Sequence, residues 1–316
     1  MDDPWLTEME SMCILVPHLV TQAQTDFIAG DIDSAERLLR KAISINQRNK
    51  DARLALASIL LRADRLNPDT LTEALTHLEA GIESDPEYVM TRAKYGWALY
   101  LAKRFDEARS VWNKVLTEEP LHGPVLSNLA QLEYLQKNYQ QAFDNYNKSL
   151  SVPEDSPFAI SNNKELRAST LYRFALAAKQ INKIDEAVSA LQLAVDYSPS
   201  YVDARFELGN TLIGMKEFGE AVSNLEIANA LQPNNPRILA ALGYSWFNLG
   251  NNQLAIEFLE QAVQNAPTFA LAWYHLGNAQ LKQGNTQGAK ESFSVAIQLQ
   301  PTFTLAKEAL SKLEGR

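Results

Sequence analysis

Residues 272–301 read AWYHLGNAQLKQGNTQGAKESFSVAIQLQP, and residues 203–233 read DARFELGNTLIGMKEFGEAVSNLEIANALQP. Each stretch ends in a proline, and such prolines recur at an interval of 34 residues. They are Pro199, Pro233, Pro267 and Pro301, with Pro86 and Pro120 at the same interval further upstream. Proline cannot continue a helix, because it lacks the amide donor and its ring clashes with the preceding turn. Each interval is therefore predicted to hold one helical unit that stops before the next begins.

Small and large residues recur at fixed places within these units. The small ones are Ala187, Ala221, Ala255 and Ala289, then Ala194, Ala228, Ala262 and Ala296, and the large ones are Leu191, Leu225, Leu259 and Phe293. Small residues let two antiparallel helices approach closely, and large ones fill the space between neighbouring pairs. A turn at Gly or Asn, such as Asn182, Gly250 or Gly284, is expected between the two helices. The pattern predicts an all-α chain.

The two quoted stretches resemble tetratricopeptide repeats, whose helix–turn–helix signature carries Trp, Leu-Gly, Tyr, Ala, Phe, Ala and Pro at fixed offsets. The matching residues are Trp273, Leu276, Gly277, Ala289, Phe293, Ala296 and Pro301. Working outward gives about eight repeats, which begin near Val16, Lys50, Val89, Gly123, Ala168, Val202, Pro236 and Ala270. The resemblance implies an α-solenoid, a right-handed superhelix of antiparallel helix pairs.

The repeats divide the chain into five predicted segments. They are a lead-in helix (1–15), N-terminal repeats 1–4 (16–150), an inserted loop (151–167), C-terminal repeats 5–8 (168–301) and a capping helix (302–316). A cap is expected because the last pair would otherwise expose an apolar edge. The lead-in helix is suggested by the spacing of Trp5, Met9, Met12 and Cys13.

The inserted loop is the largest break in the repeat. Equivalent alanines Ala142 and Ala187 are 45 residues apart, and the extra residues fall near 152–164, which is rich in Pro, Asp, Ser and Asn. That composition is typical of turns. The simplest interpretation is a surface loop, and a hinge or a partner-contacting element remains open.

Composition and charge restrict the partners. The chain of 316 residues is 46% apolar and 21% charged, within the range of folded proteins. Its formal charge of −9 disfavours nucleic acid, which requires clustered Lys and Arg. A single cysteine, Cys13, allows no intrachain disulfide. The acidic start is unlike a signal peptide, and the apolar run at 13–16 is too short for a membrane span. We expect a cytoplasmic protein without a membrane span, although a trimmed targeting segment would leave the same sequence.

Catalytic motifs are not found in the sequence. It contains no GxxxxGK[ST], GxGxxG, HExxH or GxSxG, and its four histidines fall in separate repeats without the spacing of metal ligands. We therefore expect a protein that is not an enzyme and that binds no cofactor or metal.

The resemblance also implies where a partner would bind. In this family the first helix of each pair lines a concave groove, and repeat positions 2, 5, 6, 9, 12 and 13 point into it. The candidate peptide-binding residues are Trp97, Tyr100, Asn128, Gln131, Tyr134, Tyr172, Arg173, Phe206, Asn210, Tyr244, Phe247, Tyr274 and Asn278. Side-chain amides can form hydrogen bonds with the extended backbone of a bound peptide, and aromatic rings can anchor its side chains. About half of the aromatic rings could instead pack only against neighbouring helices.

Two functional hypotheses follow. Family members that hold a C-terminal carboxylate use a Lys and an Asn in one repeat, Asn in the next, and Lys and Arg in a third. No three consecutive repeats here carry that set, because Asn210 has Phe206 four residues before it instead of lysine. The leading hypothesis is a scaffold or adaptor that binds a protein or peptide partner in the groove. The alternative is a regulatory or non-catalytic subunit of an enzyme complex, and self-association is left open.

Overall fold

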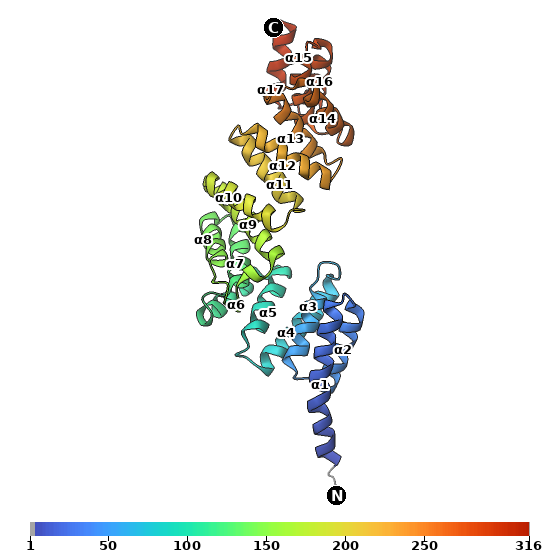
Figure 1. Cartoon of the computed structure of the whole chain (residues 1–316), viewed down its shortest axis with the longest axis vertical. Coiled ribbons are helices and arrows are strands. Elements are labelled where there is room, and N and C mark those ends of the chain that lie inside the picture. Colours follow the sequence, from blue (N-terminus) through green and yellow to red (C-terminus); the bar gives the residue numbers. More distant parts are fainter. Residues whose placement is uncertain (1–3, 316) are drawn as a thin grey trace. The chain divides into compact units, whose positions relative to one another are not determined.

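A computed structural model describes residues 4–315, with side chains from Ile14 onward. Within that range the chain forms seventeen α-helices, one short 3-10 helix and no strand. The helices, coloured along the chain in Figure 1, are grouped in two compact units, one ending at Ala159 and the other beginning at Ile160. This boundary falls within the stretch where the sequence indicates an insertion.

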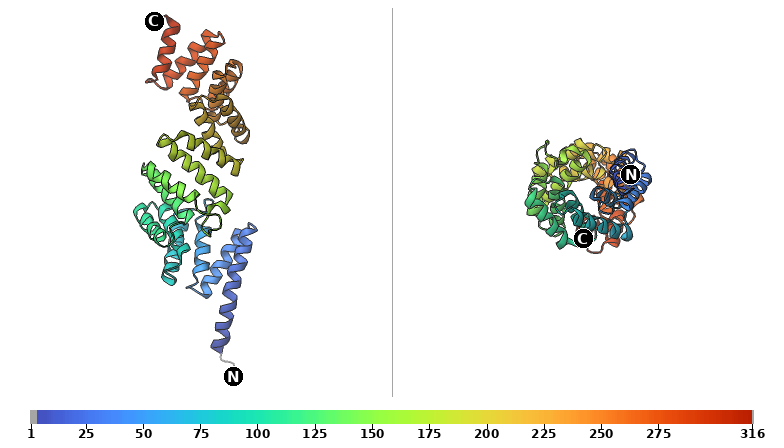
Figure 2. Two further views of the ribbon diagram at one scale, coloured as in Figure 1. Left: turned by 60° about the vertical axis from the view of Figure 1, so that its left-hand side comes forward. Right: turned by 90° about the horizontal axis from the view of Figure 1, so that it is seen from below.

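The first unit holds eight helices among the described residues. They are α1 (Pro4–Ile28), α2 (Ile32–Ile45), α3 (Lys50–Leu60), α4 (Pro68–Ser84), α5 (Val89–Leu101), α6 (Phe105–Glu118), α7 (Gly123–Leu135) and α8 (Tyr139–Leu150). Each helix contacts the next one along the chain, so that the unit is a row of stacked helix pairs (Figure 2).

The second unit repeats this arrangement. It holds η1 (Ile160–Asn162), α9 (Lys164–Gln180), α10 (Ile184–Tyr197), α11 (Val202–Gly214), α12 (Phe218–Leu231), α13 (Pro236–Asn248), α14 (Asn252–Asn265), α15 (Ala270–Lys282), α16 (Thr286–Leu299) and α17 (Thr304–Glu314). The last helix, α17, packs against α16. Stacked helix pairs in both units confirm the predicted all-α solenoid.

The helix starts follow the repeat register, with two differences. Six of the eight predicted repeat starts are the first residue of a helix, from Lys50 of α3 to Ala270 of α15. At the N-terminus, the expected lead-in helix and the first helix of repeat 1 are one helix, α1. The lead-in prediction depends on the side chains of Trp5, Met9, Met12 and Cys13, which lie outside the described side chains.

The second difference shortens the inserted loop. Helix α9 begins at Lys164, four residues before the predicted start at Ala168. The cause is Asn163, whose side-chain oxygen accepts a hydrogen bond of 2.8 Å from the amide of Leu166. An asparagine in this N-cap position satisfies an amide that would otherwise lack a partner, and thereby fixes the helix start. Residues 164–167, expected in a loop, are therefore helical.

Small residues allow the two helices of a pair to approach. A Cβ atom added to Gly277 of α15 would lie 2.6 Å from the ring of Phe293 of α16, and one added to Gly243 would lie 2.5 Å from Leu259. The turns between the helices include left-handed residues, such as Gly250 at φ +83° and Gly284 at φ +92°. Glycine adopts this conformation without steric cost. The observed φ angles confirm the turns that were predicted at these two positions.

Candidate functional site

The first helices of the pairs share one face of the second unit. Helix α11 contacts α13, and α13 contacts α15, in addition to the contacts within each pair. The thirteen candidate residues all lie on first helices, from α5 to α15. Each of their side chains is half-buried, so none belongs to the closed core and none is fully solvated. They are thus partly accessible to a ligand.

A hollow of about 260 Å³ lies across α11, α13 and α15, and we call it the α11–α13–α15 pocket. Its lining residues are Phe206, Asn210, Ile213, Arg237, Ala240, Ala241, Tyr244, Phe269, Leu271 and His275. Three of the candidates, Phe206, Asn210 and Tyr244, are therefore brought together. On α11 the lining positions are separated by four and three residues, which places them on one side of the helix.

Contacts between side-chain rings join the helices that line this pocket. The ring of Tyr244 lies 4.6 Å from that of His275 on the next first helix, and 6.3 Å from that of Phe218. The guanidinium of Arg237 lies over the ring of Phe206 at 4.9 Å, a cation–π contact that joins α13 to α11. The pocket is therefore built from side chains whose rings already contact one another.

Its polar groups retain hydrogen-bonding capacity. The side chains of Asn210 and Arg237 form no hydrogen bond or ion pair with a described residue, and the backbone amide of Arg237 donates a hydrogen bond to the side chain of Asn235. Burial lowers the pKa of His275 to about 4, because the charged imidazole would be poorly solvated there. This histidine is therefore neutral at pH 7. Among the lining residues the one charge is that of Arg237.

Several other candidates make contacts of their own. Trp97 stacks on Tyr100 with ring centroids 5.1 Å apart, and Tyr172 lies 5.3 Å from Tyr201. Tyr134 lies 5.3 Å from Tyr139, a residue of the next helix. These contacts give the aromatic candidates a packing role, and a ligand-binding role for them stays a prediction.

The remaining candidates are dispersed over both units. The hydroxyl of Tyr146 donates to the side-chain oxygen of Gln131 at 2.9 Å, which occupies part of that amide. Tyr274 contacts the rings of Phe293 and Phe303 and so belongs largely to the packing of the last repeat. Four further candidates, half-buried on α7, α9, α13 and α15, do not line the pocket. They are Asn128, Arg173, Phe247 and Asn278.

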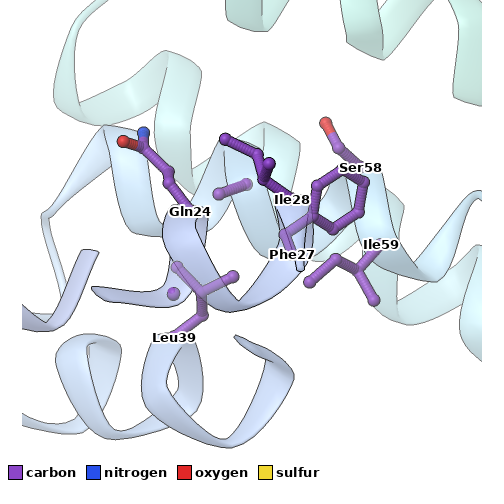
Figure 3. Close-up of a pocket in the computed structure, with 8 residues that line it drawn as sticks. Gln24, Phe27, Ile28, Leu39, Ser58 and Ile59 are labelled. Atoms are coloured by element: carbon purple, nitrogen blue, oxygen red, sulfur yellow. The ribbon is translucent and has the colours of Figure 1, made fainter. Parts of the chain in front are cut away.

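A second hollow, of about 330 Å³, lies in the first unit among α1, α2 and α3. Figure 3 shows Phe27 and Ile28 at the end of α1, beside Ser58 and Ile59 of α3. None of the thirteen candidate residues comes from these first two repeats. The signal was present in the repeat register, because Phe27 and Ile28 occupy positions 12 and 13 of repeat 1.

The described residues contain no group of three His, Cys, Asp or Glu side chains placed to hold a metal ion. In the part of the chain that the structure describes, no helix is both long and apolar enough to span a bilayer.

Comparison with known proteins gives the family. Two family models described as tetratricopeptide repeats match the chain, one at residues 27–68, 175–243 and 247–313, the other at residues 71–122. A curated relative, the Hsp70/Hsp90 co-chaperone CNS1 of Saccharomyces cerevisiae, is 32% identical over 105 residues. The match covers 32% of this chain and 24% of the relative, so the chain spans about a quarter of that protein's length.

Solved structures show the same fold. The structure of YrrB, described as a TPR protein with an unusual peptide-binding site, is 22% identical with a TM-score of 0.54, covering 63% of this chain and 96% of that one. The structure of pilF from Pseudomonas aeruginosa is 17% identical with a TM-score of 0.59, covering 74% and 97%. Because the family models match more than half of the chain and fall in both units, the chain belongs to the tetratricopeptide repeat family.

Proposed function

We propose that this protein is a non-catalytic scaffold or adaptor, and that a polypeptide segment of its partner binds in the α11–α13–α15 pocket. The observation that carries the proposal is the convergence of Phe206, Asn210 and Tyr244 on one preformed hollow. These residues come from two successive repeats and line the pocket with residues of a third.

The lining residues suit the capture of a polypeptide. Aromatic side chains such as Phe206 and Tyr244 give a large contact area at a small cost in side-chain entropy, which is why few such residues dominate many interfaces. The amide of Asn210 can both donate and accept a hydrogen bond, as an extended peptide backbone requires. Because the ring contacts exist before binding, little free energy is lost in ordering the pocket.

The relatives support a protein partner. CNS1 is named as a co-chaperone, and the YrrB structure is described as having a peptide-binding site. Each of these two descriptions names a protein or a peptide as the partner. We also propose a cytoplasmic location, since a chain with a single cysteine depends on no intrachain disulfide.

Capture of the partner tests the proposal. The immobilised full chain is incubated with lysate from the source organism, bound proteins are identified by mass spectrometry, and the captured partner is then titrated by calorimetry. Tyr244→Ala is expected to weaken binding by roughly 1–3 kcal/mol, as for an anchor residue. Asn210→Ala should cost about 1 kcal/mol, through the loss of one hydrogen bond.

A matched control comes from the second helix of repeat 6. Ser223 of α12 is exposed and does not line the pocket, so Ser223→Glu should leave the affinity unchanged. Circular dichroism melts of all variants exclude unfolding. Loss of binding in Ser223→Glu, together with full affinity in Tyr244→Ala, would show that the partner binds another surface.

A further inference from the structure

The α11–α13–α15 pocket has an uneven charge. Its ten lining residues include one arginine, no carboxylate, and a histidine that is neutral at pH 7. Arg237 is exposed at the pocket, and no described carboxylate lies within ion-pair distance of it. Elsewhere on the first helices a cation is paired, since Lys179 of α9 forms an ion pair with Glu207 of α11. The pocket thus carries an unpaired positive charge.

The orientation of Arg237 is already restricted. Its guanidinium lies 4.9 Å above the ring of Phe206, so part of its conformational entropy is lost before any ligand arrives. A guanidinium has five N–H donors and no acceptor, and it binds a carboxylate through two parallel hydrogen bonds. Asn210, which also lines the hollow, adds two amide donors.

The rest of the lining is apolar. Ile213, Ala240, Ala241, Phe269 and Leu271 present no side-chain hydrogen-bonding group. They come from α11, α13 and α15 and from the turn before α15. A ligand that fills the hollow must therefore supply an apolar group for these residues and an anionic acceptor for Arg237. The lining includes the first helices of three successive repeats, so a ligand that contacts all of it extends across three repeats.

We propose that the pocket selects an internal polypeptide segment in which a large apolar side chain adjoins an aspartate or glutamate. The apolar side chain occupies the space between Ile213 and Leu271, and the carboxylate pairs with Arg237. The inference rests on the proposed function, and it adds the chemistry of the bound segment.

A peptide array tests the selectivity. Octapeptides of the form acetyl-Gly-Ser-Gly-X-X-Gly-Ser-Gly-amide, with all pairs of residues at the two variable positions, are probed with the full chain. Acetylated and amidated ends leave the side chains as the only source of a carboxylate. We expect the strongest signals for Leu, Ile, Phe, Tyr or Trp beside Asp or Glu.

The best peptide is then compared with its amide counterpart, in which Asn replaces Asp or Gln replaces Glu. Fluorescence polarisation should give about three- to tenfold tighter binding of the acidic peptide to the wild-type chain, as for a partly desolvated ion pair. Arg237→Gln should abolish that preference and leave the affinity for the amide peptide unchanged. Tyr244→Ala should weaken both peptides. Arg205→Gln is the control, because Arg205 does not line the pocket.

Any of the following outcomes would overturn the inference. Peptides that depend on Tyr244 but show no acidic preference, or a preference that survives Arg237→Gln, would overturn the selectivity and leave the proposed function intact. Binding confined to a companion array with free C-terminal carboxylates would overturn the claim of an internal segment. An array with no bound peptide would also overturn the inference, and the partner capture would then decide the proposed function separately.

Discussion

The imidazole of His122 stacks on the ring of Phe158, with ring centroids 4.3 Å apart and an interplanar angle of 19°. Next to it, the amide of Gly123 donates a hydrogen bond of 3.1 Å to the carbonyl oxygen of Phe158. Val152, which follows α8, is buried. The segment after α8 is therefore folded back onto the start of α7, and its residues pack within the first unit.

Replacing Phe158 by alanine should destabilise the first unit. The change removes the stacked ring from a histidine that is only 2% exposed, and leaves a space beside it. We expect a loss of roughly 1–3 kcal/mol, the range for truncating a partly buried aromatic residue. Urea denaturation followed by circular dichroism measures it. Glu154→Ala, an exposed change in the same segment, is the control, and equal stability of both variants would contradict a packing role.

The same contact should make the stability depend on pH. Burial lowers the pKa of His122 to about 4 from its ordinary 6.5, and its Nδ1 accepts a hydrogen bond from the amide of Val125. Between pH 6.5 and 4 the unfolded chain takes up a proton here that the folded chain does not. Stability should therefore fall as the pH drops from 7 to 5, by about 1–2 kcal/mol from this residue.

His122→Asn isolates that contribution. Asparagine keeps a side-chain acceptor for the N-terminus of α7 but does not titrate. Its loss of stability between pH 7 and pH 5 should be smaller than that of the wild type, while His77 and His275, whose pKa values burial also lowers, contribute equally to both. Identical pH dependence of the two proteins would exclude His122 as a buried neutral group.

The sequence predicted the fold well because each repeat carries the same local signals. The 34-residue register placed six helix starts correctly, and it placed the left-handed turns at Asn182, Gly250 and Gly284. It failed where the repeat is broken. The stack of His122 on Phe158 joins two residues that no periodicity relates, and the early start of α9 depends on the single side chain of Asn163.

The candidate site was predictable only in part. The repeat register alone identified Phe206, Asn210 and Tyr244, because they occupy repeat positions that are predicted to point into the groove. Arg237 and His275 occupy repeat positions 2 and 6, which the register also predicts to point into the groove, and both line the same pocket, although neither is among the thirteen candidates. Whether a side chain of the pocket is paired with a neighbouring charge depends on contacts between different repeats. The sequence of a single repeat does not encode these contacts. The hollow at Phe27 was missed although the register pointed to it, because no candidate was taken from the first two repeats.

Asn163 offers a test of the helix start. Asn163→Ala removes the acceptor for the amide of Leu166, and loss of such a cap costs roughly 0.5–2 kcal/mol. Asn162 is its exposed neighbour and provides no cap, so Asn162→Ala should change the stability by less than about 0.5 kcal/mol. Thermal melts of the two variants, compared with the wild type, measure the difference. A loss that is equal in both would show that the cap does not fix the start of α9.

Alanine should destabilise the protein at Gly277 but not at Gly214. A Cβ atom at Gly277 would lie 2.6 Å from Cε1 and 2.7 Å from Cδ1 of Phe293, and this ring is fully buried, so it cannot turn away without displacing the side chains around it. Separating α15 from α16 enough to admit the methyl group should cost roughly 1–3 kcal/mol.

Gly214, at the end of α11, has nothing within 4 Å of such an atom and no positive φ. There alanine restricts the unfolded chain and favours the helix, so Gly214→Ala should be neutral or stabilise by up to about 1 kcal/mol. Urea denaturation of both variants gives the comparison, and a Gly277→Ala protein as stable as Gly214→Ala would mean that the two helices of the eighth repeat are not in close contact at this residue.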